Sequence, residues 1–281
     1  MLKSLEKYFP VFVLPTLTAF VLAFVIPFFM GIYLSFTEFT AVTNAKWVGL
    51  ANYVKAFTAN REFINAGWFT IRFAVVSIIS INILAFALAL LLTRGLKGTN
   101  LFRTVFFMPN LIGGIVLGYV WLLIIDGILQ HFGTALNLYA KYGFWGLIIV
   151  VCWQQIGYMM IIYIAGLQAI PEDLNEAAGI DGATGRQKLF RITIPMMMPS
   201  ITICTFLSVT NGFKLFDQNL ALTNGAPGKE TEMLAMNIFT TFYNRVGFEG
   251  VGQAKAVLFF ILVVTLGLLQ LRLTRSKEVQ H

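Results

Sequence analysis

Long apolar runs separated by short polar segments dominate the hydrophobic pattern of this sequence. Each run has about the 20 residues that a helix needs to cross the hydrocarbon core of a bilayer. Transmembrane β-strands would instead give short alternating segments. The pattern therefore predicts an all-α membrane protein, a single domain over 1–281, whose six spans cover approximately 9–36, 68–93, 104–126, 144–168, 192–216 and 251–273.

Two spans carry a basic residue near one end, Arg72 in the second and Lys255 in the sixth. We expect their long stems to reach the headgroup region. Pro27, Pro109, Pro195 and Pro199 lie within or at the ends of spans. Each removes a backbone donor, so each is expected to kink its helix.

Three polar segments connect the spans with recognisable local structure. WVGLANYVKAF at 47–57 predicts a short amphipathic helix, and LTNGAPGKETE at 222–232 contains turn-forming Asn-Gly and Pro-Gly pairs. The third segment, 169–191, begins with acidic residues after Pro171, which favour a helix start. Gly182 and Gly185 are expected to break that helix before a second one at RQKLFR, 186–191.

Composition agrees with a membrane protein, since 58% of the residues are hydrophobic and only 12% are charged, about half the usual charged share. The excess of 20 Lys and Arg over 13 Asp and Glu raises the possibility of nucleic-acid binding. The basic residues, however, occur in small groups beside apolar runs, as the flanks of membrane spans do. We therefore expect contact with the lipid bilayer and none with nucleic acid.

The two cysteines, Cys152 and Cys204, both lie inside apolar runs. They form neither a CxxC pair nor a cluster with histidine, so we interpret them as packing residues. Neither a disulfide nor a metal site is expected.

Charge placement predicts the orientation of the chain. The N-terminus, the 94–103 and 169–191 loops and the tail hold 11 of the 20 basic residues, with Arg94, Lys97 and Arg103 the clearest group. Because basic loops stay in the cytoplasm, and six spans put both ends on one side, both termini are predicted to be cytoplasmic. Residues 8–37 carry no charge, too long a stretch for a signal peptide, so the first span is expected to be retained.

The 169–191 segment has two physical interpretations. It is either an amphipathic connector lying on the membrane surface or a docking helix for a soluble partner. In the second case the small residues Ala177, Ala178 and Gly179 would let a partner's groove approach the backbone. Glu176 and Asp181 would supply charge-assisted hydrogen bonds. Composition leaves both open.

Fixed spacing over twenty positions resolves the choice by resemblance. Glu176-Ala177-Ala178 is followed after three residues by Gly182, and after nine more by Ile192-Thr193-Ile194-Pro195. This resembles the EAA loop of ABC importer permeases, with Ile194 in place of the usual leucine. The segments 47–57, 101–121, 165–183, 213–234 and 268–273 also resemble the carbohydrate-uptake class, specifically the first subunit of the usual pair.

The resemblance implies a type I ABC importer permease fold with a cytoplasmic coupling-helix loop. It implies a second, similar permease subunit, two cytoplasmic ATPase subunits and an extracytoplasmic sugar-binding protein, in a bacterial cytoplasmic membrane. The chain itself would bind no cofactor and catalyse nothing, since ATP and Mg would be used by the ATPase. In agreement, it has no GxxxxGK[ST] phosphate loop.

Two sets of site residues are expected. The coupling contact would involve Glu176, Ala177, Ala178, Asp181, Gly182, Ile192 and Pro195, and Gly182→Val is expected to uncouple ATP hydrolysis from uptake. The sugar pathway would draw on the amides and aromatics Asn82, Asn110, Tyr119, Trp153, Gln154, Asn211 and Phe213.

Each pathway candidate has an alternative role. Polar groups in membranes often bond between helices, and aromatics often form the interfacial belt. We expect Gly114 and Gly118, a GxxxG pair, to pack helices and Lys214 to pair with Asp217.

A secondary transporter driven by an ion gradient is the alternative function. It would usually need intramembrane ionisable groups or an inverted repeat, neither of which the sequence shows. An intramembrane enzyme is less favoured, because the spans contain no HExxH, GxSxG or paired-carboxylate pattern.

Overall fold

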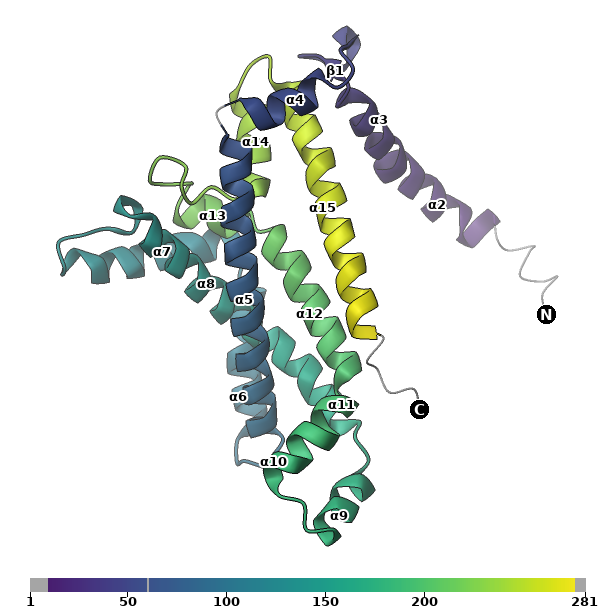
Figure 1. Ribbon diagram of the computed structural model, residues 1–281, viewed down its shortest axis with the longest axis vertical. Coiled ribbons are helices and arrows are strands. Elements are labelled where there is room, and N and C mark those ends of the chain that lie inside the picture. Colours follow the sequence, from purple (N-terminus) through teal and green to yellow (C-terminus); the bar gives the residue numbers. More distant parts are fainter. Residues whose placement is uncertain (1–9, 60, 276–281) are drawn as a thin grey trace. The chain divides into compact units, whose positions relative to one another are not determined.

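The computed structural model describes residues 10–59 and 61–275, and helices make up most of them (Figure 1). The chain forms two compact units. The first unit contains the residues up to 63 together with 238–260, and the second contains 64–237 together with the residues from 261. The prediction of one domain over 1–281 stays a prediction. Phe9, Lys3, Lys7 and Lys277, on which the first span's start and part of the charge argument rest, lie outside the described residues.

The first unit begins with one continuous apolar stretch, Leu14–Leu34. It consists of α2 (Leu14–Phe20), a π-helical turn (Val21–Val25) and α3 (Ile26–Leu34). The widened turn comes directly before Pro27, which has no N–H to donate to the preceding turn. The proline predicted to disturb this span therefore does so without interrupting it.

Beyond α3 a two-stranded sheet leads into the short amphipathic helix. Strands β1 (Thr37–Glu38) and β2 (Lys46–Trp47) pair antiparallel, with the 3-10 turn Val42–Asn44 between them. Helix α4 (Ala51–Thr58) confirms the helix expected within 47–57. Its buried Asn52 donates from Nδ2 to the carbonyls of Ser35 (3.0 Å) and Thr37 (2.8 Å), which fixes α4 against the end of α3.

Three charged residues of the first unit, Lys255, Arg245 and Glu62, have partners inside that unit. Lys255, on α15 (Glu249–Arg275), is only 4% exposed and donates to Thr241 Oγ1 of α14 (Leu234–Asn244) at 2.8 Å. Its ammonium also lies 5.4 Å from the centre of the Phe63 ring. The expectation that Lys255 reaches the headgroups is therefore wrong, because this hydroxyl and this ring hold the charge inside the protein. Arg245 pairs with Glu62 at the start of α5 (Glu62–Leu92).

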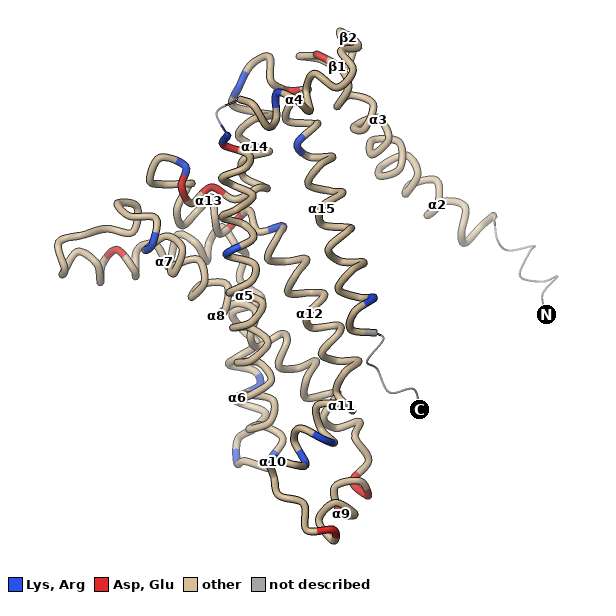
Figure 2. The backbone as a smooth tube through the Cα atoms, in the orientation of Figure 1, with Lys and Arg blue, Asp and Glu red and all other residues tan. Residues whose placement is uncertain are grey.

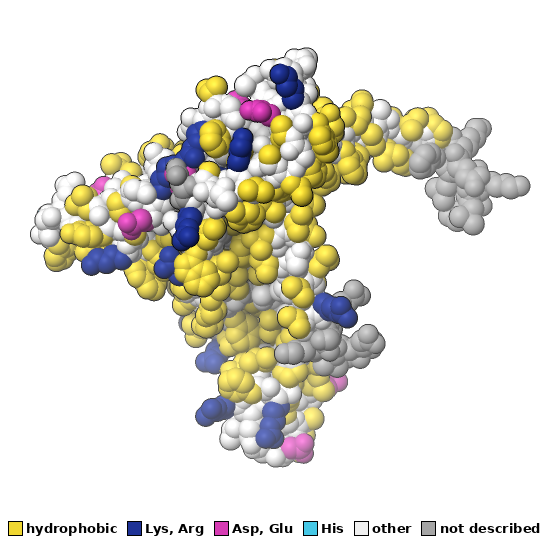
Figure 3. All heavy atoms as spheres, turned by 45° about the horizontal axis from the view of Figure 1, so that its top comes forward, with side chains coloured by type: hydrophobic (Ala, Val, Ile, Leu, Met, Phe, Trp, Pro, Cys, Tyr) yellow, Lys and Arg dark blue, Asp and Glu magenta, His cyan; other side chains and the backbone are white. Residues whose placement is uncertain are grey.

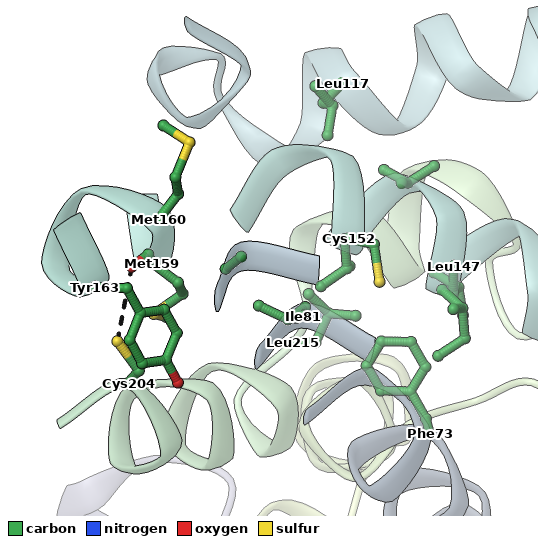
Figure 4. Close-up of a cluster of buried hydrophobic side chains, with 14 of the residues drawn as sticks. Phe73, Ile81, Leu117, Leu147, Cys152, Met159, Met160, Tyr163, Cys204 and Leu215 are labelled. Atoms are coloured by element: carbon green, nitrogen blue, oxygen red, sulfur yellow. Dashed lines mark hydrogen bonds between the residues drawn. The ribbon is translucent and has the colours of Figure 1, made fainter. Parts of the chain in front are cut away.

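The second unit is built around α8 (Ala140–Gln168), most of whose apolar window is buried. Side chains of α5, α8 and α12 (Met198–Phe213) meet in a core that includes Phe73, Ile81, Met159, Tyr163 and Cys204 (Figure 4). Cys152 and Cys204 are both buried and free in this core, as their interpretation as packing residues predicts.

Within 10–59 and 61–275, four helices are long and apolar enough to cross a membrane: Leu14–Leu34, Glu62–Leu92, Ala140–Gln168 and Glu249–Thr274. They correspond to the first, second, fourth and sixth predicted spans. Two further pairs of helices become spans if each bent pair counts as one, which gives up to six. Large apolar side chains cover the outside of the helices, as Figure 3 shows for one face. Such surfaces suit lipid or another apolar partner.

The third predicted span, 104–126, is not one straight helix. Helix α6 (Thr99–Phe107) continues through a 3-10 turn (Met108–Leu111) and meets α7 (Gly114–Gln130) at 101°. Pro109 falls in the 3-10 turn. The two residues that follow the turn, Ile112 and Gly113, have extended ψ angles of 129° and 139°. The helical hydrogen bonds stop there, so the direction of the chain changes.

The fifth predicted span, 192–216, also bends. The helical stretch Gly185–Met196 meets α12 at 69° around Met197, two residues before Pro199. It contains α10 (Gly185–Lys188), a π-helical turn (Leu189–Thr193) and α11 (Ile194–Met196). Pro199 cannot donate the backbone hydrogen bond that would continue the helix past Pro195, which accounts for the bend at this place.

Helix α7 packs directly on the short helix α13 (Asp217–Leu222) through two of its three glycines. A Cβ added at Gly114 would lie 2.7 Å from Asp217 Cβ, and one at Gly118 would lie 2.6 Å from Ala221 Cβ. Only hydrogen fits at either position, so the prediction that Gly114 and Gly118 form a helix-packing contact is confirmed.

Candidate functional site

A polar pocket of about 350 Å³ opens in the second unit where α12 ends and α13 begins. Helix α12 stops at Phe213 and α13 starts at Asp217, so the connector 214–216 turns the chain over the pocket. Helix α8 and the 3-10 turn after α6 supply the other walls. The residues that line the pocket are Asn110, Gln154, Gln155, Asn211, Lys214, Leu215, Phe216, Asp217 and Gln218.

Hydrogen bonds between amides hold the walls of this pocket. Gln218 Nε2 donates to Gln154 Oε1 at 2.5 Å, and Gln154 Nε2 donates to the Ile112 carbonyl at 3.1 Å. Asn211 Nδ2 makes a longer bond to Gln155 Oε1, at 3.4 Å. The first two bonds tie α13 and α8 to the break between α6 and α7, so the pocket depends on that bend.

Other polar groups of the pocket remain available to a ligand. Within the described part of the chain, the side chains of Asn110, Lys214 and Asp217 make no hydrogen bond or ion pair. Together they offer amide and ammonium donors with amide and carboxylate acceptors. A small pocket lined by such groups suits a ligand with many hydroxyl groups.

The structure separates the seven predicted pathway residues into two groups. Asn110, Gln154 and Asn211 meet in the pocket. Tyr119 and Trp153 are exposed on α7 and α8, where Trp153 packs on Trp121, and Phe213 is buried in its helix.

Asn82 has partners on two other helices. Its Oδ1 accepts from the Tyr163 hydroxyl at 2.6 Å, and its Nδ2 donates to the Ile78 carbonyl and to Ser208 Oγ. This is the interhelical bonding that was its alternative interpretation.

Sequence reasoning missed the apolar Leu215 and Phe216 of the pocket and four of its polar residues, Gln155, Lys214, Asp217 and Gln218. Lys214 and Asp217 were expected to pair with each other, which is wrong: no ion pair joins them among the described residues. The signal that could have found Lys214, Asp217 and Gln218 is their nearness in the sequence to the predicted Asn211, since all three follow it within seven residues.

The second candidate site is the loop that carries the Glu-Ala-Ala motif. Helix α9 (Glu172–Ile180) presents Glu176 and Ala177 to the surface and half-buries Ala178. Asp181 follows as its C-cap, and Gly182 takes a φ of +73°. The amides of Gly182 and Ala183 donate back to the carbonyls of Gly179 (3.1 Å) and Ala178 (2.9 Å). These are the two bonds of a Schellman motif, in which glycine is the usual left-handed residue.

The next helix begins with its own cap. Thr184 Oγ1 accepts from the Gln187 amide, and Gln187 Oε1 accepts from the Thr184 amide at 2.7 Å, so the two residues form a capping box. Gly185 is the first residue of α10, which corrects the expectation that it breaks the helix. Lys188 Nζ returns to the Asn175 carbonyl at 2.9 Å and ties α10 to α9.

A second depression, of about 280 Å³, lies between these helices. Its lining brings together three predicted coupling residues, Asp181, Gly182 and Ile192, with Ala183, Gln187, Lys188 and Arg191. Pro195 lies further on, in α11. Acidic residues lie on α9 and basic residues on and after α10, as Figure 2 shows. Ile180 is 88% exposed at the end of α9, an apolar anchor beside these charges.

Comparisons with known proteins agree with this geometry. The family described as "Binding-protein-dependent transport system inner membrane component" matches residues 81–278. The probable starch degradation products transport system permease protein AmyD of Thermoanaerobacterium thermosulfurigenes is 41% identical, over 96% of this chain and 94% of that protein. The multiple sugar-binding transport system permease protein MsmF of Streptococcus mutans is 30% identical, over 99% of each chain.

Solved structures with the same fold include two of bacterial alginate ABC transporters. The transporter described as importing the acidic polysaccharide alginate superposes with a TM-score of 0.82 at 20% identity, over 98% of each chain. The complex with an alginate pentasaccharide-bound periplasmic protein gives 0.81 at 19% identity, over 98% of this chain and 96% of that one. The fold is therefore that of a type I ABC importer permease. The chain belongs to the family of inner membrane components of binding-protein-dependent transport systems, the permease subunits of ABC importers.

Proposed function

We propose that this chain forms half of the pathway for a sugar, an oligosaccharide or related glycoside, across a bacterial cytoplasmic membrane. A second, similar permease supplies the other half, and two cytoplasmic ATPase subunits use ATP and Mg. An extracytoplasmic binding protein delivers the sugar. This chain catalyses no reaction and binds no cofactor. Both of its termini lie in the cytoplasm, on the same side as α9.

The exposed, self-capped loop around α9 is the observation that carries the proposal. Glu176 and Ala177 are presented on a helix whose C-terminal end is closed by the Schellman turn, next to the exposed Ile180. Such a helix offers a partner's groove an acidic group, a small-residue face and an apolar anchor at little cost in ordering. A connector lying in the membrane surface would bury Ile180 among lipids, but would need none of the caps.

The polar pocket supports a hydroxylated substrate. Its amides, one ammonium and one carboxylate provide donors and acceptors in about 350 Å³. The names of AmyD and MsmF refer to starch degradation products and to multiple sugars. We assign the substrate contacts to Asn110, Gln154 and Asn211.

Purification of this chain from its native membrane tests the coupling role. The wild type should bring down a second permease and an ATPase with measurable hydrolysis, whereas Glu176→Lys should lose the ATPase because it reverses the charge of the side chain at the proposed contact. Glu230→Lys, an exposed charge reversal in a different loop, is the matched control and should retain the ATPase. If the chain purifies alone, or both variants behave as wild type, the proposal is wrong.

A further inference from the structure

A chain of buried amides runs from the 223–233 loop to the break between α6 and α7. Asn219 on α13 is completely buried and bonds at both ends of its amide. Its Nδ2 donates to the Thr231 carbonyl (2.8 Å) and to Thr223 Oγ1 (2.9 Å), and its Oδ1 accepts from the Met233 amide (3.0 Å). Both ends of the loop are thereby fixed to α13.

The loop presents a small exposed tip on this buried base. Thr223, Thr231, Glu232 and Met233 are buried, whereas Asn224 and the stretch 228–230 are exposed. The exposed tip is therefore connected to α13 through the hydrogen bonds that Asn219 makes with the buried base of the loop. A displacement of the tip would be passed to α13 through these bonds.

Helix α13 in turn packs closely on α7. A Cβ at Gly118 would overlap Ala221, and one at Gly114 would lie 3.0 Å from the Gln218 amide carbon. The two helices and the loop therefore behave as one body, which we call the α7–α13 arm (114–130 and 217–233). The adjoining extended residues, Ile112 and Gly113, are the point where the arm joins α6.

The arm packs on α8 at a small residue, Gly143, and is hydrogen-bonded to α8 through Gln154. A Cβ at Gly143 of α8 would lie 2.9 Å from Thr231 Cγ2, so the loop lies flat on that helix. Gln154 of α8 bonds both to Gln218 of the arm and to the Ile112 carbonyl at the break. Rotation about Ile112–Gly113 would break these bonds and change the walls of the polar pocket.

We propose that Asn219 is a positioning residue that transmits docking of the binding protein on the 223–233 loop to the polar pocket, through the α7–α13 arm and the Gln218–Gln154 latch. This inference rests on the proposed function, since it requires a binding protein that docks on this side. It adds to that function the path by which docking reaches the pocket.

The assembled transporter, purified with its ATPase, tests the inference by two measurements. Loaded binding protein should stimulate ATP hydrolysis by the wild type and change amide hydrogen exchange over residues 108–120. In Asn219→Ala we expect the stimulation to fall about tenfold and the exchange change to disappear, because each partner that is left unpaired is buried. Basal hydrolysis without binding protein should stay as in the wild type.

Asn237→Ala is the matched control. Asn237 is an equally buried amide and donates to Glu232 of the same loop, but it lies on α14 and outside the arm. It should keep both the stimulation and the exchange change. Thr223→Val keeps the shape and removes two bonds to Asn219, the one that Asn219 Nδ2 donates to Thr223 Oγ1 and the one that Thr223 Oγ1 donates to the Asn219 carbonyl. It leaves the other bonds of the Asn219 amide, so it should give an intermediate stimulation, and it serves if Asn219→Ala does not assemble.

The outcomes separate the two proposals. Full stimulation with an unchanged exchange response in both Asn219→Ala and Thr223→Val would overturn the relay and leave the proposed function standing. Equal losses in Asn237→Ala would also overturn it, since any loosening of the loop would then suffice. A wild type with no associated ATPase and no response to binding protein would contradict the proposed function itself.

Discussion

Amide side chains in the second unit either bond neighbouring helices together or line the polar pocket, and their hydrogen-bond partners show which role each has. Asn82 is saturated by Tyr163, Ile78 and Ser208, whereas Asn110 lines the pocket with no partner among the described residues. The sequence identified both as polar groups inside spans. It could not separate them, because Tyr163 and Ser208 are 81 and 126 residues away from Asn82 along the chain.

Substitution of Asn82 should affect stability more than sugar selection. Asn82→Ala removes the acceptor of the Tyr163 hydroxyl and the amide that donates to Ser208 Oγ, which we expect to lower the free energy of unfolding by about 1 to 2 kcal/mol. Asn211→Ala, at the open pocket, should instead reduce uptake with little change in stability. Thermal unfolding of the purified complexes and uptake of labelled sugar measure the two effects. Equal stability with lost uptake in Asn82→Ala would place Asn82 in the pathway after all.

Gly182 and Gly185 provide a matched pair for the coupling loop. Neither has an atom within 4 Å of an added Cβ, but only Gly182 has a positive φ, of +73°. Gly182→Val should therefore strain the backbone by about 1 to 2 kcal/mol, without a clash and with little effect on the amount of inserted protein. We expect it to lower sugar taken up per ATP hydrolysed, whereas Gly185→Val should behave as wild type. Comparable loss in both variants would assign the effect to side-chain bulk.

At the scale of the elements, the apolar pattern predicted which segments are helical better than where they bend. The second, fourth and sixth runs correspond to continuous helices because nothing in them interrupts the backbone bonds. The third run looks equally apolar, yet two extended residues after Pro109 turn it by 101°. The proline was visible in the sequence, but the size of the bend depends on how α7 packs on α13, which composition does not encode.

The α7–α13 contact gives a prediction with an internal rescue. Gly118→Ala should overpack against Ala221 and cost about 1 to 3 kcal/mol in the free energy of unfolding. Ala221→Gly in the same chain should recover most of it, because it removes the methyl group that the new one meets. Gly127→Ala on the same helix meets nothing within 4 Å and is the control. Thermal unfolding of the three variants in detergent measures these differences, and equal stability of Gly118→Ala and Gly127→Ala would contradict the tight contact.

At the scale of the whole molecule, the proposed orientation assigns each loop to one side of the membrane. The basic loop at 94–98 and the 171–188 segment should be cytoplasmic, and the 223–233 loop should be outside. The assignment rests on the positive-inside rule, since 11 of the 20 lysines and arginines lie in the segments assigned to the cytoplasm.

Cysteine labelling checks this orientation with few changes. The native Cys152 and Cys204 are buried, so a membrane-impermeant maleimide should not reach them. In right-side-out vesicles we expect Glu230→Cys to react, and Lys97→Cys and Arg186→Cys to react only after the membrane is opened. All three positions are exposed, so a reversed result would invert the topology.

The caps of the coupling segment have a consequence for engineering. Within residues 171–188, a Schellman turn caps the end of α9 and a capping box caps the start of α10. The bond from Lys188 back to the Asn175 carbonyl joins the two helices. Their local shape therefore needs little from the rest of the chain. We therefore expect that the segment can be transplanted. Replacing the corresponding loop of another permease with residues 171–188 should change which ATPase binds, without changes to that permease's membrane spans.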